Sequence, residues 1–248
     1  MKRVFTLLFS PLAFLRLLLM LALTAFIVIV GSLWFLFFGF SPRLQQWMER
    51  NWGKCALFIC GFKLNYNEIP AATNFILMPN HRSYVDIFIV ARLMPSAMVG
   101  KAELAKWPFG RLAIKATHSI LVDRNNSSSL LHTMRAIKTS VSRGIPVTLF
   151  PEGTTFKGPL TKAFKNGSFK IAADAHIPVI PMAIEYHDKN DAWIGQETFV
   201  GHFFRQMWKP RRRVYVRFGK PVSNSNYQQL QHDVKVAIDT MLEQLQDL

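Results

Sequence analysis

The sequence predicts an α/β fold in which helices flank a mixed central sheet, preceded by an apolar helical element. After Pro70, short β-type runs alternate with segments of helical periodicity, which is typical of βα units. The uncharged stretch from Leu17 to Phe40 predicts the apolar element. We therefore expect residues 1–62 to form an N-terminal membrane-anchoring helical element and residues 63–248 to form one α/β domain.

Composition narrows the class of partner. The 248 residues suffice for one catalytic domain, and 30 Lys and Arg against 15 Asp and Glu give a net charge of +15, which favours polyanionic partners. A chain that is 50% hydrophobic and contains 21 Phe favours an anionic membrane surface over nucleic acid. Cys55 and Cys60 have no metal-ligand partners at suitable spacing, so we expect small core residues and no disulfide framework.

The apolar stretch is long enough to cross a bilayer. As a helix it would be about 36 Å long, against a hydrocarbon core of about 30 Å. A signal peptide competes with this interpretation, but its apolar region is usually only about 7–15 residues long. Basic residues flank both sides and leave the orientation open, while apolar and polar residues are interleaved from Pro42 to Phe62. A spanning helix and a re-entrant helix pair both remain open.

The elements of the α/β domain follow in order. A helix around residues 130–141 is expected to face the core and to stop at Gly144, a half-exposed strand is expected at Val214–Phe218, and a final helix from about Tyr227 should cover the sheet with Leu230, Val234, Ile238, Met241 and Leu245. The runs that we expect as central strands are Phe75–Met78, Ile120–Val122, Val147–Phe150 and Val179–Ile184.

A histidine and an aspartate follow the first of these strands. His81 and Asp86 would lie about 140° apart on one helix. We therefore expect His81 in the strand-to-helix turn and Asp86 in the first helical turn, reaching back. Pro79 and Asn80 suit such a turn. A carboxylate on one imidazole nitrogen lets the other deprotonate a hydroxyl, whereas the alternative is a helix-capping aspartate beside an ordinary histidine.

A second motif, Phe150–Thr155, follows another expected strand, where α/β sheets place ligand sites. Gly153 lets the backbone approach a ligand, and the threonines offer hydroxyl groups. Glu152 can either bond a substrate hydroxyl or hold a neighbouring turn.

Together these blocks make the sequence similar to the glycerolipid acyltransferase family, the lysophosphatidate and lysophospholipid acyltransferases. The blocks that carry the resemblance are Asn80–Asp86, Gly100–Leu104 with Pro108 and Gly110, Ile120–Arg124, Phe150–Thr154 and Val179–Ile184. The resemblance implies transfer of an acyl group from a thioester of coenzyme A or acyl carrier protein to a lysolipid hydroxyl, with no metal and no cofactor.

The resemblance also implies roles for residues. His81 would be the general base and Asp86 its orienting partner. A thioester is already activated and needs no enzyme nucleophile, so we interpret Ser83 as a helix N-terminal residue. The substrate contacts are expected from Lys101, Arg124, Glu152, Gly153, Thr154 and Thr155.

The sequence departs from the family pattern at Thr155. Lysophosphatidate enzymes usually carry arginine at this position. Arginine can bind a phosphate through a forked contact, and threonine cannot make that contact. Lys157, Lys162 and Lys165 remain as sources of positive charge. We expect 1-acyl-sn-glycerol 3-phosphate as the acceptor, giving phosphatidic acid. The alternative is lyso-ornithine lipid, whose acyltransferases share the Thr-Thr ending, or another lysophospholipid.

A basic run from Arg205 to Lys220 contains no acidic residue and predicts contact with anionic lipid head groups, although docking of an acidic acyl carrier protein needs the same charge. We expect a membrane-bound enzyme at a bacterial inner membrane, with its catalytic domain on the cytoplasmic face. A non-catalytic lipid-binding or nucleic-acid-binding protein is the alternative of a different class.

Overall fold

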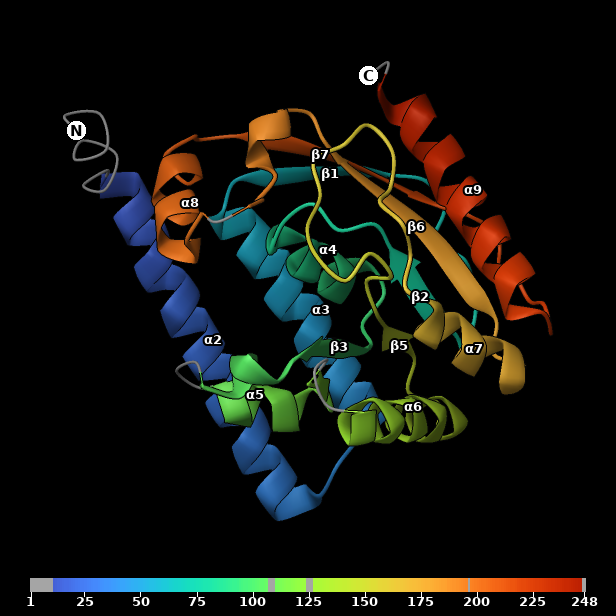
Figure 1. Ribbon diagram of the computed structural model, residues 1–248. Coiled ribbons are helices and arrows are strands. Elements are labelled where there is room, and N and C mark those ends of the chain that lie inside the picture. The colour runs from blue at the N-terminus through green and yellow to red at the C-terminus, as the bar shows by residue number, and fades with distance from the viewer. Residues whose placement is uncertain (1–10, 107–109, 124–126, 196, 247–248) are drawn as a thin grey trace.

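A seven-stranded sheet forms the centre of the molecule (Figure 1) in a computed structural model that describes residues 11–106, 110–123, 127–195 and 197–246. The strand order is β1-β7-β6-β2-β5-β3-β4. All neighbouring strands are parallel except β6 and β7, so the expected mixed sheet is confirmed. The strands are β1 (Phe62–Tyr66), β2 (Ile76–Pro79), β3 (Ala97–Lys101), β4 (Ile120–Val122), β5 (Val147–Thr148), β6 (Val179–Tyr186) and β7 (Arg212–Phe218).

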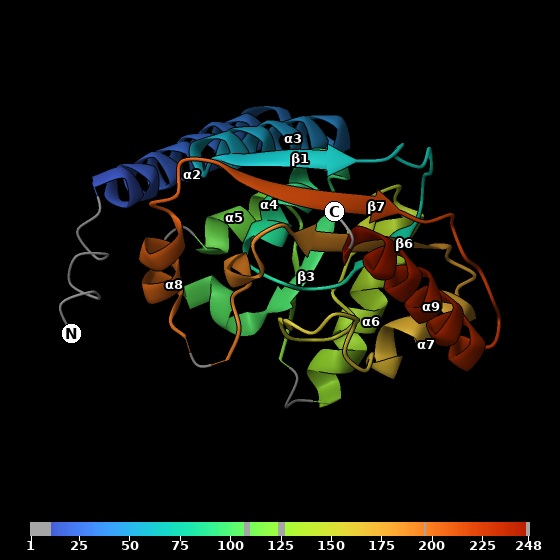
Figure 2. The same cartoon turned by 90° about the horizontal axis from the view of Figure 1, so that it is seen from above.

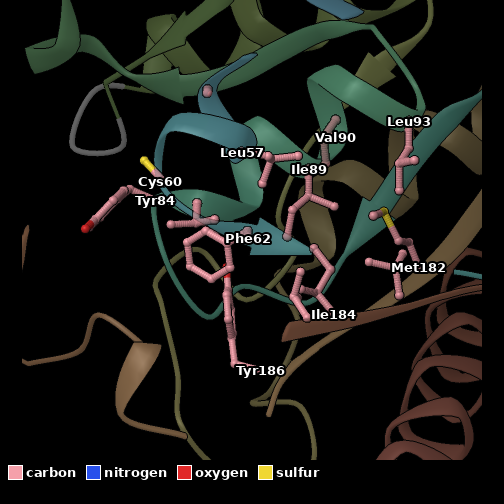
Figure 3. Close-up of a cluster of buried hydrophobic side chains, with 14 of the residues drawn as sticks. Leu57, Cys60, Phe62, Tyr84, Ile89, Val90, Leu93, Met182, Ile184 and Tyr186 are labelled. Atoms are coloured by element: carbon pink, nitrogen blue, oxygen red, sulfur yellow. The ribbon is translucent and has the colours of Figure 1, made fainter. Parts of the chain in front are cut away.

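Helices cover both faces of the sheet (Figure 2). Alternate residues of β2 and β6 point to opposite faces, and each face has its own apolar core. One core lies under α3 and α4 (Figure 3), and the other lies under α6, α7 and α9. The helices are α2 (Pro11–Phe38), α3 (Pro42–Ile59), α4 (Val85–Leu93), α5 (Gly110–Ala116), α6 (Ser127–Ser142), α7 (Asn166–Asp174), α8 (Phe199–Gln206) and α9 (Tyr227–Gln246), with short 3-10 turns at Ala102–Lys106 and Lys189–Asp191.

Most expected elements are present, with three corrections. Strand β4 has the expected bounds but lies at the edge of the sheet, because it pairs only with β3. On α9 the fully buried residue is Leu242, while Met241 packs at the margin of the same core. Cys55 is exposed and Cys60 buried, since α3 packs on the domain through the face that carries Ala56 and Leu57.

The N-terminal element is a pair of helices joined by a short turn (Figure 1). Ser41 caps α3 by accepting a hydrogen bond from Leu44 N–H at 3.4 Å, and Pro42 opens the helix. Helix α2 does not stand apart from the domain. Ala13 and Met20 join the core under α3 and α4. The boundary at residue 62 stays a prediction.

Arg16 fastens α2 to a segment that lies 191 to 194 residues further along the chain. Its guanidinium is buried and donates hydrogen bonds to the carbonyl oxygens of Met207 (2.7 Å), Lys209 (2.6 Å) and Pro210 (3.1 Å). These three hydrogen bonds offset much of the free-energy cost of burying the charged guanidinium. The first turns of α2 are therefore held against the segment between α8 and β7.

Candidate active site

The predicted site residues gather where neighbouring parallel strands end. Strand β2 lies between β6 and β5 and stops at Pro79, and the chain then turns through His81 into α4. Strand β5 stops at Thr148 and leads into the Phe150–Thr155 segment. The carboxyl ends of parallel strands share one edge of the sheet, so both motifs meet there.

Asp86 reaches back from the first turn of α4 to His81, as expected from the spacing. His81 Nδ1 and Asp86 Oδ2 are 2.8 Å apart, and Asp86 is fully buried. The same oxygen accepts the backbone N–H groups of Arg82 (2.6 Å) and Ser83 (2.8 Å). Asp86 therefore binds the turn before the helix and orients the histidine at once. The contact with the turn before the helix and the contact with His81, which the spacing left as alternatives, are both present.

The imidazole of His81 is fixed on two sides. Asp86 accepts at Nδ1, which places the proton there and leaves the lone pair on Nε2. The ring stacks on Phe150, with centroids 3.9 Å apart and planes at 22°. The His81 side chain keeps 19% of its surface exposed. It is therefore rigid yet accessible, and its Nε2 can accept a proton from a hydroxyl brought by a substrate.

Glu152 binds the protein backbone through both carboxylate oxygens. Its Oε1 accepts His81 N–H at 2.9 Å, and its Oε2 accepts Lys162 N–H at 2.9 Å. Burial raises the pKa of Glu152, and these two hydrogen bonds oppose the rise. Of the two roles that its sequence position allowed, this geometry is that of holding neighbouring turns.

Arg82 and Asn80 hold the same turn, and we predicted no role for Arg82. The Arg82 side chain is buried, donates to Phe156 O at 2.9 Å and pairs with Glu185 at 3.1 Å. The Asn80 side chain donates to Ile184 O and accepts Ile184 N–H, at 3.0 and 2.7 Å. Their position beside His81, on a turn that needs hydrogen bonds, was the available signal.

The remaining predicted residues are those expected to contact the substrate. Gly153 adopts φ +73°, a conformation that glycine tolerates best, Thr154 is exposed and Thr155 is half-buried. Lys101 is exposed at the carboxyl end of β3, and among the described residues no hydrogen bond or ion pair joins it to His81 or Asp86. Arg124 lies outside the described residues.

Ser83 Oγ is buried and has no hydrogen-bond partner among the residues that the structure describes. Its backbone N–H donates to Asp86 at the entrance to α4. This position agrees with our interpretation of Ser83 as a helix N-terminal residue.

No cluster of three or more His, Cys, Asp or Glu side chains is placed to hold a metal ion within the part of the chain that the structure describes. The expectation of a site without metal or cofactor stays a prediction.

The fold and the site define a class of protein: an α/β enzyme with a His–Asp pair, held at the strand ends, that can deprotonate a hydroxyl. A family model described as Acyltransferase matches residues 63–185, which include every element of this site. The chain is an acyltransferase of the family that includes lyso-ornithine lipid and 1-acyl-sn-glycerol-3-phosphate acyltransferases.

Individual relatives and a solved structure agree with this family. The chain is 28% identical over 225 residues to a lyso-ornithine lipid O-acyltransferase of Rhizobium meliloti, covering 83% of this chain and 75% of the relative. It is 29% identical over 175 residues to a 1-acyl-sn-glycerol-3-phosphate acyltransferase of Salmonella typhimurium, covering 68% and 71%. It shares its fold with the 1-acyl-sn-glycerophosphate acyltransferase PlsC of Thermotoga maritima, with a TM-score of 0.68, 20% identity and coverage of 93% and 98%.

Proposed function

We propose that the protein is a membrane-bound acyltransferase that moves a fatty acyl group from an acyl thioester to the free hydroxyl of 1-acyl-sn-glycerol 3-phosphate, giving phosphatidic acid. The acyl donor is acyl-coenzyme A or acyl carrier protein. The observation that carries this proposal is the buried carboxylate of Asp86 on Nδ1 of His81, which leaves Nε2 as the basic nitrogen of a side chain that keeps 19% of its surface exposed.

The reaction needs one base and no covalent enzyme intermediate. Nε2 of His81 takes the proton of the acceptor hydroxyl as its oxygen attacks the thioester carbonyl carbon. The new C–O bond forms, the C–S bond breaks, and the imidazolium returns its proton to the departing thiolate. Asp86 stabilises the imidazolium in between.

Replacement of the base tests this mechanism. His81→Ala should lower kcat by about 100-fold or more, the usual contribution of general-base catalysis, and leave the thermal unfolding temperature in detergent nearly unchanged. The matched control is His232→Ala, an exposed histidine on α9, which should keep wild-type turnover. Full activity of His81→Ala, or an acylated protein trapped with acyl donor alone, would sink the mechanism.

Lyso-ornithine lipid is the second candidate acceptor. Thr155 favours it because threonine lacks the forked guanidinium contact with phosphate, and the Rhizobium meliloti relative is named for this acceptor. Purified protein in detergent should be assayed with lysophosphatidate, lyso-ornithine lipid and neutral lysophospholipids, as wild type and as Thr155→Arg. Turnover of lysophosphatidate above the others supports the first proposal, and a preference for lyso-ornithine lipid replaces it.

The outward face of α2 supports a membrane location. The helix is 28 residues long, and an 18-residue window of it has a mean hydropathy of 2.7, with 17% of that window buried against the protein. Its buried positions recur at helical spacing from Ala13 to Gly31, so one side of α2 packs on the domain for most of its length. We propose that the opposite side enters one leaflet and that α2 and α3 form the re-entrant pair, since a full span would draw the attached domain into the bilayer.

Part of the basic run is engaged in ion pairs or buried. Arg205 pairs with Glu197 at 2.6 Å, Lys209 pairs with Asp188 at 2.6 Å, and Arg212 is buried. The exposed residues Arg211, Arg213 and Lys220 remain available for contact with anionic head groups. Orientation towards the cytoplasm and a bacterial inner membrane remain part of the proposal.

A further inference from the structure

Tyr186, the last residue of β6, binds the Asp86 oxygen that His81 leaves free. Its hydroxyl donates to Asp86 Oδ1 at 2.6 Å, across 100 residues of sequence, while Oδ2 receives His81 and two backbone N–H groups. Both side chains are almost fully buried. The carboxylate is therefore saturated with hydrogen-bond donors, and within the described ranges Tyr186 is the one donor that comes from neither the turn nor α4.

The sheet register puts Tyr186 at this level. Strand β2 ends at Pro79, which pairs with Met182, and β6 continues to Tyr186 beyond that point. The Asn80 side chain bridges to Ile184 and continues the ladder past the end of β2. Residues 182, 184 and 186 face α4, because side chains alternate along a strand. Tyr186 thus meets the first turn of α4.

The phenol is a fixed and neutral donor. Its ring makes a T-shaped contact with the ring of Phe62, with centroids 5.9 Å apart (Figure 3). This packing holds the ring in place while its hydroxyl donates to Asp86. Burial raises the pKa of Tyr186 far above its usual range, and the neighbouring Asp86 raises it further. Tyr186 keeps its proton at every working pH, and Asp86 serves as the acceptor.

We infer that Tyr186 is a positioning residue for acyl transfer, which holds Asp86 in one orientation and so sets the charge that faces His81 and the direction of its ring. This inference rests on the proposed role of His81 as the base. Hydrogen bonds to a carboxylate withdraw charge from it. Loss of the Tyr186 hydroxyl therefore leaves more negative charge on the Asp86 oxygens that face the imidazole, and this charge stabilises the imidazolium more strongly.

Loss of the Tyr186 hydroxyl should leave the other charged groups around His81 and Asp86 in place. Glu152 binds the His81 backbone N–H, and Arg82 turns its guanidinium to Glu185 and Phe156 O. From β6, Glu185 also pairs with Lys189 at 3.0 Å. None of these contacts uses the Tyr186 hydroxyl.

The test is the pH profile of kcat/KM for Tyr186→Phe. We expect the acid limb to move to higher pH by about half a unit or more, and kcat to fall about tenfold while KM for both substrates stays near the wild-type value. The matched control is Tyr215→Phe. Tyr215 is half-buried on β7 and packs on the opposite face of the sheet from Tyr186, and its removal should leave the acid limb in place.

Two further measurements keep the inference falsifiable. Thermal unfolding in detergent shows whether Tyr186→Phe is folded at the assay temperature. If it is not, 3-fluorotyrosine at position 186, a stronger donor, should move the acid limb to lower pH. An unmoved limb in a folded variant overturns the inference even if His81→Ala is inactive, whereas an active His81→Ala overturns the proposed mechanism itself.

Discussion

At the residue scale, the site is a turn in which backbone and side chains share the same acceptors. Asp86 and Glu152 each bind one backbone N–H or more while they hold His81 from opposite ends. The backbone of His81 is fixed by Glu152, and its ring is fixed by Asp86 and Phe150. Small changes at either carboxylate should therefore reach the base.

Glu152→Gln tests the backbone side of this arrangement. A carboxamide has one acceptor oxygen, so its NH₂ group must face one of the two N–H groups that Glu152 accepts. We expect a loss of about 1–3 kcal/mol in the free energy of unfolding and a lower kcat, measured by denaturant unfolding and by acyl transfer in detergent. Glu243→Gln, at an exposed position on α9, is the control, and unchanged stability in Glu152→Gln would contradict this role.

At the element scale, the N-terminal helix pair supports the catalytic helix. Helix α3 packs against α4 so closely that a Cβ atom on Gly53 would lie 2.6 Å from Phe88 O and from Arg92 N. Glu49 is buried at the same junction and accepts hydrogen bonds from Gln45 Nε2 (2.8 Å) and Ser96 N–H (2.9 Å). The N-terminal helix pair and the helix that carries Asp86 are thus one packed unit.

Glu49 makes the stability of this junction depend on pH. Burial raises its pKa from 4.5 to about 8, despite the hydrogen bonds from Gln45 and Ser96. The folded protein binds this proton more tightly than the unfolded chain does. The resulting stabilisation is present below about pH 4.5 and is lost as pH rises through 8.

Between pH 5 and 9, wild type should lose up to about 4 kcal/mol more free energy of unfolding than Glu49→Gln, as measured by unfolding in detergent. Glu68→Gln, which removes an exposed carboxylate, should keep the wild-type pH slope. Equal slopes for wild type and Glu49→Gln would contradict the raised pKa.

At the scale of the whole molecule, α2 presents an exposed apolar side and is fastened to the domain that carries the His81 site. Phe26 and Leu33 on α2 are 63% and 51% exposed, and α2 is fixed to the domain through Arg16. A lipid layer is the surrounding that covers such a face without cost. Fixed attachment would present the His81 site to lipid at a constant height.

The double variant Phe26→Glu with Leu33→Glu tests the membrane face. Each apolar side chain that no longer enters lipid removes about 1.5–3 kcal/mol, so binding to vesicles that contain anionic phospholipid should fall about 100-fold or more. Turnover in detergent should persist because the site is untouched. Val236→Glu, an exposed valine on α9, should bind vesicles like wild type, and undiminished binding by the double variant would exclude α2 as the membrane face.

Sequence by itself determined the features that depend on neighbours along the chain. The five-residue spacing of His81 and Asp86 after a strand already required a turn and a reaching carboxylate, and the long uncharged run required an apolar helix. Tertiary structure decided the rest. The sequence left Glu152 free to bind either substrate or backbone, and the positions of the His81 and Lys162 N–H groups decided for the backbone. The exposure of Cys55 followed from the packing of α3, and the edge position of β4 followed from strand pairing.

Tyr186 was beyond sequence reasoning for the same physical reason. Its contact with Asp86 spans 100 residues and depends on β6 running past the end of β2, which no local pattern encodes. The attachment of α2 by Arg16 likewise joins residues that are 191 positions apart in the sequence. Local spacing determined which residues can perform the chemistry, and the sheet register and helix packing determined which groups hold them in place.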